Sequence, residues 1–168
     1  MRRVTIALIF LLVVAALAQQ PATKSKDAKA ASAKTEVRHT YTQQQMQWGP
    51  PPPFVPPGAQ MTVLEGDPGA STGSFTIRVK TPDGYVVPPH WHPKRENVTV
   101  VSGAMRLGMG DKMDESKMTS LPAGSFAYLD PDMHHYVKMK GETVVQIHGP
   151  SPLAFNYVNP NDDPSKKK

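Results

Sequence analysis

The stretch that decides the fold runs from residue 84 to residue 103 and reads GYVVPPHWHPKRENVTVVSG. His90 and His92 are separated by one residue, and Glu96 follows beyond a proline turn. Successive side chains of a β-strand point to opposite faces, so His90 and His92 share one face while Trp91 points to the other. Glu96 can return on the next strand to the same pocket.

Two imidazoles and one carboxylate form a ligand set suited to Mn, Fe, Zn or Ni, with positions left open for a substrate. Two surface histidines would also give a His-x-His pair, so the pair alone does not distinguish the two interpretations. The spacing of all three residues favours a site. The sequence therefore predicts one divalent transition metal, without indicating which.

The chain on either side of this stretch consists of short strand-like runs separated by turn residues at intervals of about 8–12, which is typical of an antiparallel sandwich or barrel. No amphipathic helical period of useful length is present. We expect an all-β domain with strands at 61–66, 74–80, 97–102, 105–109, 125–129, 136–140, 143–148 and 153–158.

Five residues carry a resemblance to a known superfamily. Gly84, His90, His92, Glu96 and Gly103 have the spacing of the first cupin motif, G-x5-H-x-H-x3,4-E-x6-G. The chain thus resembles the cupin superfamily. Its runs Pro-Pro-Gly-Ala-Gln at residues 56–60 and Glu-Thr-Val-Val-Gln-Ile-His-Gly at residues 142–149 resemble, more narrowly, small exported single-domain cupins. This resemblance implies a jelly-roll β-barrel of two antiparallel sheets with the metal between them, and commonly a homodimer.

The second cupin motif, G-x5-P-x-G-x2-H-x3-N, is matched only in part. Gly124 and His135 agree with it, whereas Asp130, Asp132 and Met139 replace its proline, glycine and asparagine. Aspartate visits the left-handed region more readily than most residues, so Asp132 can still serve the turn that the motif's glycine makes.

The resemblance implies that His135 is the fourth metal ligand, beside His90, His92 and Glu96. His134 stays an alternative, because the substituted positions weaken the register of the second motif. If His135 is the ligand, we expect His134 to face the outer side of the barrel or the mouth of the strands.

Three further polar residues are candidates for substrate binding. Arg78 and Ile77 are neighbours on one strand, so their side chains point to opposite faces. Arg78 could bind a substrate carboxylate bidentately if its face points into the barrel interior. The alternation favours the exterior, where Arg78 would be a solvated charge. Gln146 and His148 share a face in the same way, and they fit either the mouth of a pocket or a half-buried edge.

The first residues have the pattern of a secretory signal peptide. Arg2 and Arg3 precede an apolar run at residues 4–17, and small residues at Ala16 and Ala18 predict cleavage after Ala18. An uncleaved anchor is disfavoured, because about 14 residues span only ~21 Å of a ~30 Å hydrocarbon core. We expect an exported protein, periplasmic or secreted, that is not held at a membrane after cleavage.

Composition limits the partners. The formal net charge of +5 lies largely in the ends of the chain, so we expect no nucleic-acid partner. The chain has no cysteine, which excludes thiolate metal ligands and cysteine nucleophiles.

The chain divides into five expected segments. They are a signal peptide (1–18), a low-complexity linker (19–45), a Pro-rich extended segment (46–60), the cupin barrel (61–158) and a basic disordered tail (159–168). We expect the Pro-rich segment to pack along a barrel edge, with Trp48 and Phe54 as anchors.

Two functions follow from the predicted site. The first is a metalloenzyme of the dioxygenase, isomerase or lyase type that acts on a small polar molecule. The second is a non-catalytic, metal-dependent ligand-binding or sensing module of the cell envelope. The short connection between Gly103 and Gly124 favours the second, because it leaves little chain to close over a pocket. The resemblance does not decide between them, since fold does not settle function.

Overall fold

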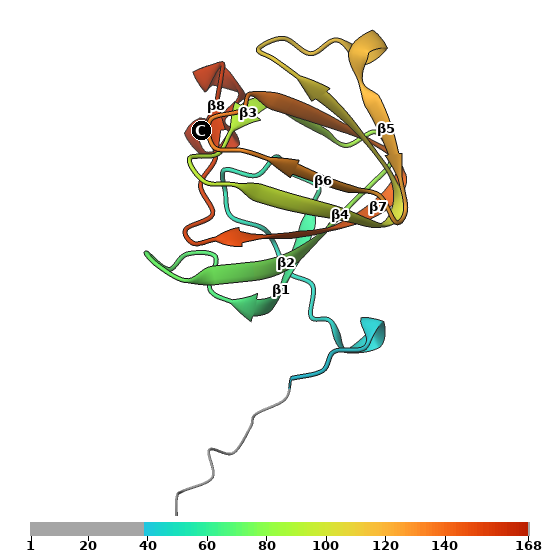
Figure 1. Ribbon diagram of the computed structural model, residues 1–168, viewed down its shortest axis with the longest axis vertical. Helices are drawn as coiled ribbons and strands as arrows, with labels where there is room; N and C mark the ends of the chain where they lie inside the picture. The colour runs from blue at the N-terminus through green and yellow to red at the C-terminus, as the bar shows by residue number, and fades with distance from the viewer. Residues whose placement is uncertain (1–38, 168) are drawn as a thin grey trace, which may run out of the picture. The chain divides into compact units, whose positions relative to one another are not determined.

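The structure is a computed structural model that describes residues 39–167, so the expected signal peptide and most of the linker lie outside the described residues. No helix in this part of the chain is long and apolar enough to cross a membrane. The elements shown in Figure 1 are β1 (Gln60–Gly66), β2 (Ser74–Thr81), β3 (Val86–Trp91), β4 (Glu96–Met109), β5 (Thr119–Pro122), β6 (Phe126–Leu129), β7 (His135–Pro150) and β8 (Asn156–Tyr157), with 3-10 turns η1 (Gln43–Gln45), η2 (Glu115–Lys117), η3 (Pro160–Asp162) and η4 (Pro164–Lys166).

Two long antiparallel strands, β4 and β7, connect the two sheets of the barrel. They pair with each other from Asn97 opposite His148 to Met109 opposite His135. The first half of β4 also pairs with β6 and the second half with β5, while β7 pairs with β3 through its first half and β2 through its second. This arrangement confirms the predicted all-β cupin barrel of antiparallel sheets.

The sequence predicted four strands where the structure has these two. Gly103 and Gly141 lie between the expected halves with φ values of 73° and 72°, and the β4–β7 register shifts between Val100 and Ala104. A Cβ atom at Gly103 would lie 2.4 Å from the carbonyl oxygen of Glu142. The glycines therefore allow each strand to bend from one sheet into the other without ending.

The core lies between the sheets and is built from the inward positions of their strands. Its buried members are Ala59, Tyr85, Val87, Val98, Val100, Met105, Val137, Met139 and Val145. Strands from both sheets contribute, as expected where apolar and polar positions alternate along each strand. The predicted strand at 153–158 is reduced to the two residues of β8, and β5 was not predicted.

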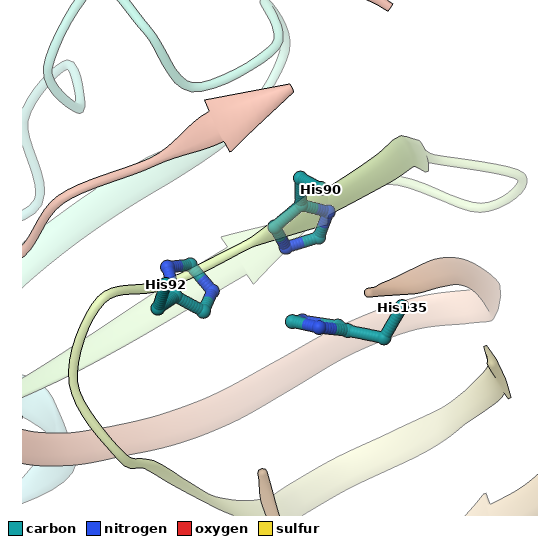
Figure 2. Close-up of side chains that lie close together, drawn as sticks. All are labelled: His90, His92 and His135. Carbon is teal, nitrogen blue, oxygen red and sulfur yellow. The ribbon is translucent and has the colours of Figure 1, made fainter. Parts of the chain in front are cut away.

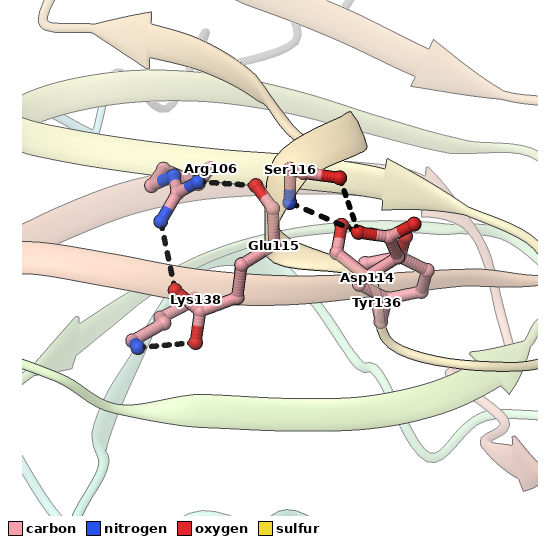
Figure 3. Close-up of polar contacts among 6 residues, drawn as sticks. All are labelled: Arg106, Asp114, Glu115, Ser116, Tyr136 and Lys138. Atoms are coloured by element: carbon pink, nitrogen blue, oxygen red, sulfur yellow. Dashed lines mark hydrogen bonds and ion pairs between the residues drawn. The ribbon is translucent and has the colours of Figure 1, made fainter.

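The loop between β4 and β5 folds over the outer face of the barrel, as Figure 3 shows. Glu115 accepts hydrogen bonds from Arg106 Nη1 at 3.0 Å and from Lys138 Nζ at 2.6 Å. The hydroxyl of Tyr136 donates to the carbonyl of Asp114 at 3.2 Å. Tyr136 is only 1% exposed, so this loop covers an aromatic ring on the outer face next to His135.

The Pro-rich segment packs along the barrel, and two tyrosines hold it there. The hydroxyl of Tyr85 donates to the carbonyl of Pro56 at 2.6 Å, and that of Tyr157 donates to the carbonyl of Phe54 at 2.7 Å. The Phe54 ring stacks on Phe155 with centroids 5.9 Å apart. Burial raises the pKa of both tyrosines, which keeps these hydroxyls as donors.

Trp48 and the C-terminal tail also adopt defined positions. The ring of Trp48, the other expected anchor, lies under the ammonium group of Lys80 on β2, 4.8 Å from the ring centroid. The described part of the expected disordered tail forms η3 and η4. Each turn begins with a proline after a capping residue, Asn159 or Asp163, whose side chain accepts a backbone N–H two residues later.

Candidate metal centre

Three histidines meet at one end of the barrel interior (Figure 2). His90 lies on β3, His92 follows the end of that strand, and His135 is the first residue of β7, paired with His90. Their exposed fractions are 2%, 6% and 2%. One ring nitrogen from each lies within 4.8 Å of those of the other two. The structure thus brings together three of the four predicted ligands as one buried cluster.

Backbone carbonyls fix the orientation of all three rings. The Nδ1 atoms of His90, His92 and His135 lie 2.7, 2.6 and 2.9 Å from the carbonyl oxygens of Pro88, Ala154 and Met133 respectively. A carbonyl can only accept, so each Nδ1 carries the proton and each Nε2 keeps its lone pair. Histidines that bind metals in proteins are oriented in this way.

Glu96, the first residue of β4, completes the predicted set. Its side chain is 11% exposed, and its Oε2 atom lies 3.6 Å from the Nε2 atoms of both His92 and His135. With the protons on Nδ1, no hydrogen lies between the carboxylate oxygen and either lone pair. A cation placed among these atoms would remove the repulsion between them.

The donor set fits a transition-metal ion. His92 Nε2 is the buried side-chain polar atom in residues 39–167 that has no hydrogen-bond partner, and leaving such an atom unsatisfied is costly. Imidazole nitrogens bind Zn at about 2.1 Å, which places neighbouring ligands roughly 3.0–3.5 Å apart in a tetrahedral or octahedral site. The ring nitrogens, which lie within 4.8 Å of one another, would move together by up to about 1.3–1.8 Å to reach that spacing.

Burial keeps two of the three imidazoles, His90 and His135, in the neutral form that binds metals. Burial lowers the pKa of His90 well below its usual range, and the neighbouring His135 and His92 lower it further. Burial also lowers the pKa of His135, against the opposing charge of Glu96. These imidazoles are therefore neutral at pH 7, as metal binding requires.

The metal-free protein is expected to lose stability as the pH falls below about 6.5, the ordinary histidine value. Below that pH the unfolded chain binds protons that folded His90 and His135 do not, so unfolding is favoured. Melting temperatures of chelator-treated protein between pH 7.5 and 5 would check this. In a His90→Gln variant, the melting temperature should fall less as the pH is lowered. A melting temperature that rises on acidification would contradict the prediction.

His134 points away from the cluster, as expected if His135 is the ligand. Its side chain is 37% exposed, and its Nδ1 lies 2.6 Å from a carboxylate oxygen of Asp111. The ring stacks on Trp91 with centroids 6.3 Å apart. Trp91 therefore takes the face opposite to His90 and His92.

An apolar cavity of about 80 Å³ adjoins the cluster. His90, Glu96 and His135 line one part of it, and most of the remaining wall is aliphatic or aromatic. The ring of Phe155 lies parallel to that of His90, at an angle of 8° and a centroid distance of 4.1 Å.

Sequence reasoning missed two parts of this wall. Val55, from the Pro-rich segment, and Phe155, from the segment before β8, both line the cavity. Part of the wall therefore comes from segments outside the Gly103–Gly124 connection, namely the Pro-rich segment and the chain before β8. No local signal relates these segments to the histidines.

Arg78, Gln146 and His148 do not line the cavity. Arg78 Nε donates to Gln146 Oε1 at 3.1 Å across the β2–β7 pair, on the face opposite to Ile77. His148 lies beside a shallow surface hollow between β2 and β7. The structure thus places the three substrate-binding candidates away from the cavity wall, and Arg78 has the exterior placement that the alternation favoured.

Solved structures share this fold at low sequence identity. The polyketide cyclase RemF from Streptomyces resistomycificus is 14% identical, with a TM-score of 0.63 over 77% of this chain and 92% of that one. KdgF from a Halomonas species is 19% identical, with a TM-score of 0.52 over 68% and 96%. An RmlC-like cupin from Shewanella frigidimarina is 14% identical, with a TM-score of 0.52 over 68% and 91%. These likenesses show the fold alone.

A comparison with curated protein sequences finds no match. The family model described as the ChrR cupin-like domain matches residues 36–154, which is more than half of the chain. This range includes every residue of the histidine cluster and most of the cavity wall. The chain therefore belongs to the cupin superfamily, within the family of ChrR cupin-like domains.

Proposed function

We propose that this chain is a metal-dependent enzyme that holds one divalent transition metal through His90, His92, Glu96 and His135 and acts on a small molecule in the barrel cavity. One observation carries the proposal: three oriented imidazoles and a carboxylate gather in one cluster, and His90, Glu96 and His135 of that cluster line an apolar cavity. A bound metal would supply Lewis-acid polarisation of a substrate oxygen, or activation of dioxygen.

The surrounding residues have separate tasks in this proposal. The carbonyls bonded to Nδ1 hold the imidazoles in place, and the apolar wall excludes water and so strengthens electrostatic interactions at the cluster. Glu96 lines the cavity and can accept a proton from a substrate carbon or hydroxyl at its carboxylate oxygen when it is not a ligand. The dioxygenase, isomerase and lyase reactions expected from the sequence can all use a carboxylate that accepts a proton close to the bound oxygen of the substrate.

The test combines metal analysis with a turnover screen. Metal-loaded protein, Glu96→Gln and the outward-facing control His134→Gln would be incubated with small oxygen-bearing compounds, with and without dioxygen. Turnover that Glu96→Gln lowers by about 10²–10⁴ at equal metal content, and that the control preserves, would support the proposal. Ligand binding without turnover in metal-loaded protein would instead favour the non-catalytic binding module.

Chelation separates the two functions in a second way. A purely structural metal contributes folding free energy, so its removal should lower the melting temperature by many degrees. An open catalytic site should lose activity far more than stability. Melting curves and turnover measured on the same chelated sample would show which loss is larger.

Export and homodimer formation stay predictions. The first rests on Arg2, Arg3 and the apolar run at residues 4–17. Intact mass of the secreted or periplasmic protein would test it, with an N-terminus at Gln19 as the expected result.

A further inference from the structure

We infer that the substrate of the proposed site is a compact molecule with an oxygen donor at one end and an otherwise apolar body. Only one part of this inference, the oxygen donor at one end of the ligand, rests on the proposed function. It replaces the small polar molecule expected from the sequence.

The cavity wall offers polar groups at one end and almost none elsewhere. Apart from His90, Glu96 and His135, its polar side chains are Thr81 and Tyr85. The Thr81 hydroxyl already donates to the carbonyl of Thr143 at 3.2 Å, and the Tyr85 hydroxyl donates to the carbonyl of Pro56. A second polar group on a ligand would therefore find no free side-chain donor.

No lysine or arginine lines the cavity. A carboxylate or phosphate placed away from the histidine cluster would be buried without a counter-charge, which is strongly unfavourable. Aliphatic side chains such as Val98, Val145 and Ile147 would instead contact an apolar body. The wall thus selects against a ligand that is charged at both ends.

The size of the cavity limits the body of the ligand. One water molecule needs about 10–15 Å³ of comparable volume. A cavity of about 80 Å³ therefore holds roughly six or seven non-hydrogen atoms. Larger ligands would have to displace the flanking segments that supply Val55 and Phe155.

Phe155 directs the ligand toward the Nε2 side of the cluster. Its ring stacks on the face of His90 and meets His92 edge-on, with centroids 4.8 Å apart. The face of the His90 ring is therefore covered. An oxygen donor can approach along the Nε2 direction while the apolar body stays in the cavity.

The test compares pentane-2,4-dione with malonate. Both have the same number of non-hydrogen atoms and two oxygen donors in the same relation, but malonate carries charged oxygens where the dione carries methyl groups. The readout is NMR of protein labelled with ¹³C at the methionine methyls. Met61, Met105 and Met139 line the cavity, whereas Met109 and Met133 lie outside it and are 46% and 42% exposed.

We expect pentane-2,4-dione to shift the methyl signals of Met61, Met105 and Met139 in metal-loaded protein and to leave those of Met109 and Met133 unchanged. Malonate should bind at least about tenfold more weakly, because the outer oxygen of each carboxylate, which takes the place of a methyl group of the dione, finds no partner in the apolar wall. Equal or tighter binding of malonate, or shifts confined to the exposed methyls, would overturn the inference.

Toluene added to metal-free protein separates this inference from the proposed function. It is similar in size and has no oxygen donor, so it tests the apolar cavity alone. If toluene changes the signals of the three cavity methyls, the apolar class of ligand is retained. If the same protein fails to bind metal even after reconstitution, the metalloenzyme is rejected. Unchanged cavity methyls with toluene and with the dione, in protein that does bind metal, would reject the apolar ligand and retain the metal site.

Discussion

Replacing His135 by alanine is expected to abolish stoichiometric metal binding, whereas replacing the adjacent His134 leaves about one equivalent bound. His135 is 2% exposed and belongs to the cluster, while His134 is 37% exposed and bonded to Asp111. Substitution of a residue that hydrogen-bonds to a metal ligand already costs about 10–100-fold in metal affinity. Loss of a ligand itself should therefore cost more than about 100-fold.

Metal content would be measured by mass spectrometry on protein purified without chelator and after reconstitution with Mn, Fe, Zn or Ni. His92→Ala should behave like His135→Ala, because its Nε2 is the buried atom without a partner. Circular dichroism would establish that each variant is folded. Equal metal loss in His134→Ala and His135→Ala would contradict the assignment of the fourth ligand.

Replacing Gly108 by alanine is expected to destabilise the barrel by about 3 kcal/mol, near the upper end for overpacking a core. An added Cβ atom would lie 2.1 Å from Cε2 of Tyr136, whose ring is 1% exposed under the β4–β5 loop. The ring cannot move outward without breaking its hydrogen bond to Asp114. A loss of this size corresponds to a fall in melting temperature of about 10 °C or more for a domain of this size.

Gly49→Ala is the matched control, because a Cβ atom there meets nothing within 4 Å. It should leave the melting temperature unchanged or raise it slightly. Adding Tyr136→Leu to the Gly108→Ala variant should cost less than the sum of the two single changes, since the smaller side chain relieves the clash. A Gly108→Ala protein as stable as Gly49→Ala would show that the ring is not confined.

The sequence predicted which donor side chains lie together, partly from local geometry and partly from the cupin resemblance. The period of two in a strand placed His90 and His92 on one face and Trp91 on the other, and the structure shows this arrangement. The resemblance to the second cupin motif implied His135 and not His134, and the structure places His135 beside His90 and His92. The first prediction depends only on the local geometry of one strand, whereas the second needed the motif.

The continuity of β4 and β7 could not be predicted in the same way. Gly103 and Gly141 have positive φ values, which serve a hairpin turn and a bend within a strand equally well. Only the pairing of β4 with β7 along its whole length distinguishes the two. The register of strands far apart in sequence therefore decided what the local pattern left open.

The chemistry of the cavity was also hidden from the sequence. Its wall combines single positions from many strands with Val55 and Phe155 from the flanks. No window of the sequence contains these residues together, so a polar substrate looked compatible with the candidates Arg78 and Gln146. Once the strands are assembled, both lie on the outer face of the barrel.

The carbonyl partners of the three imidazoles suggest how such a site tolerates evolutionary drift. Each partner belongs to the main chain, at positions 88, 133 and 154, so a substitution there changes the side chain and leaves the carbonyl in place. The orientation of each imidazole ring then depends on the path of the backbone and not on the identity of any neighbouring side chain. Selection for a different ion would have to act on Glu96 or on the residues that surround the ligand, and homologues should vary there while their histidine geometry stays constant.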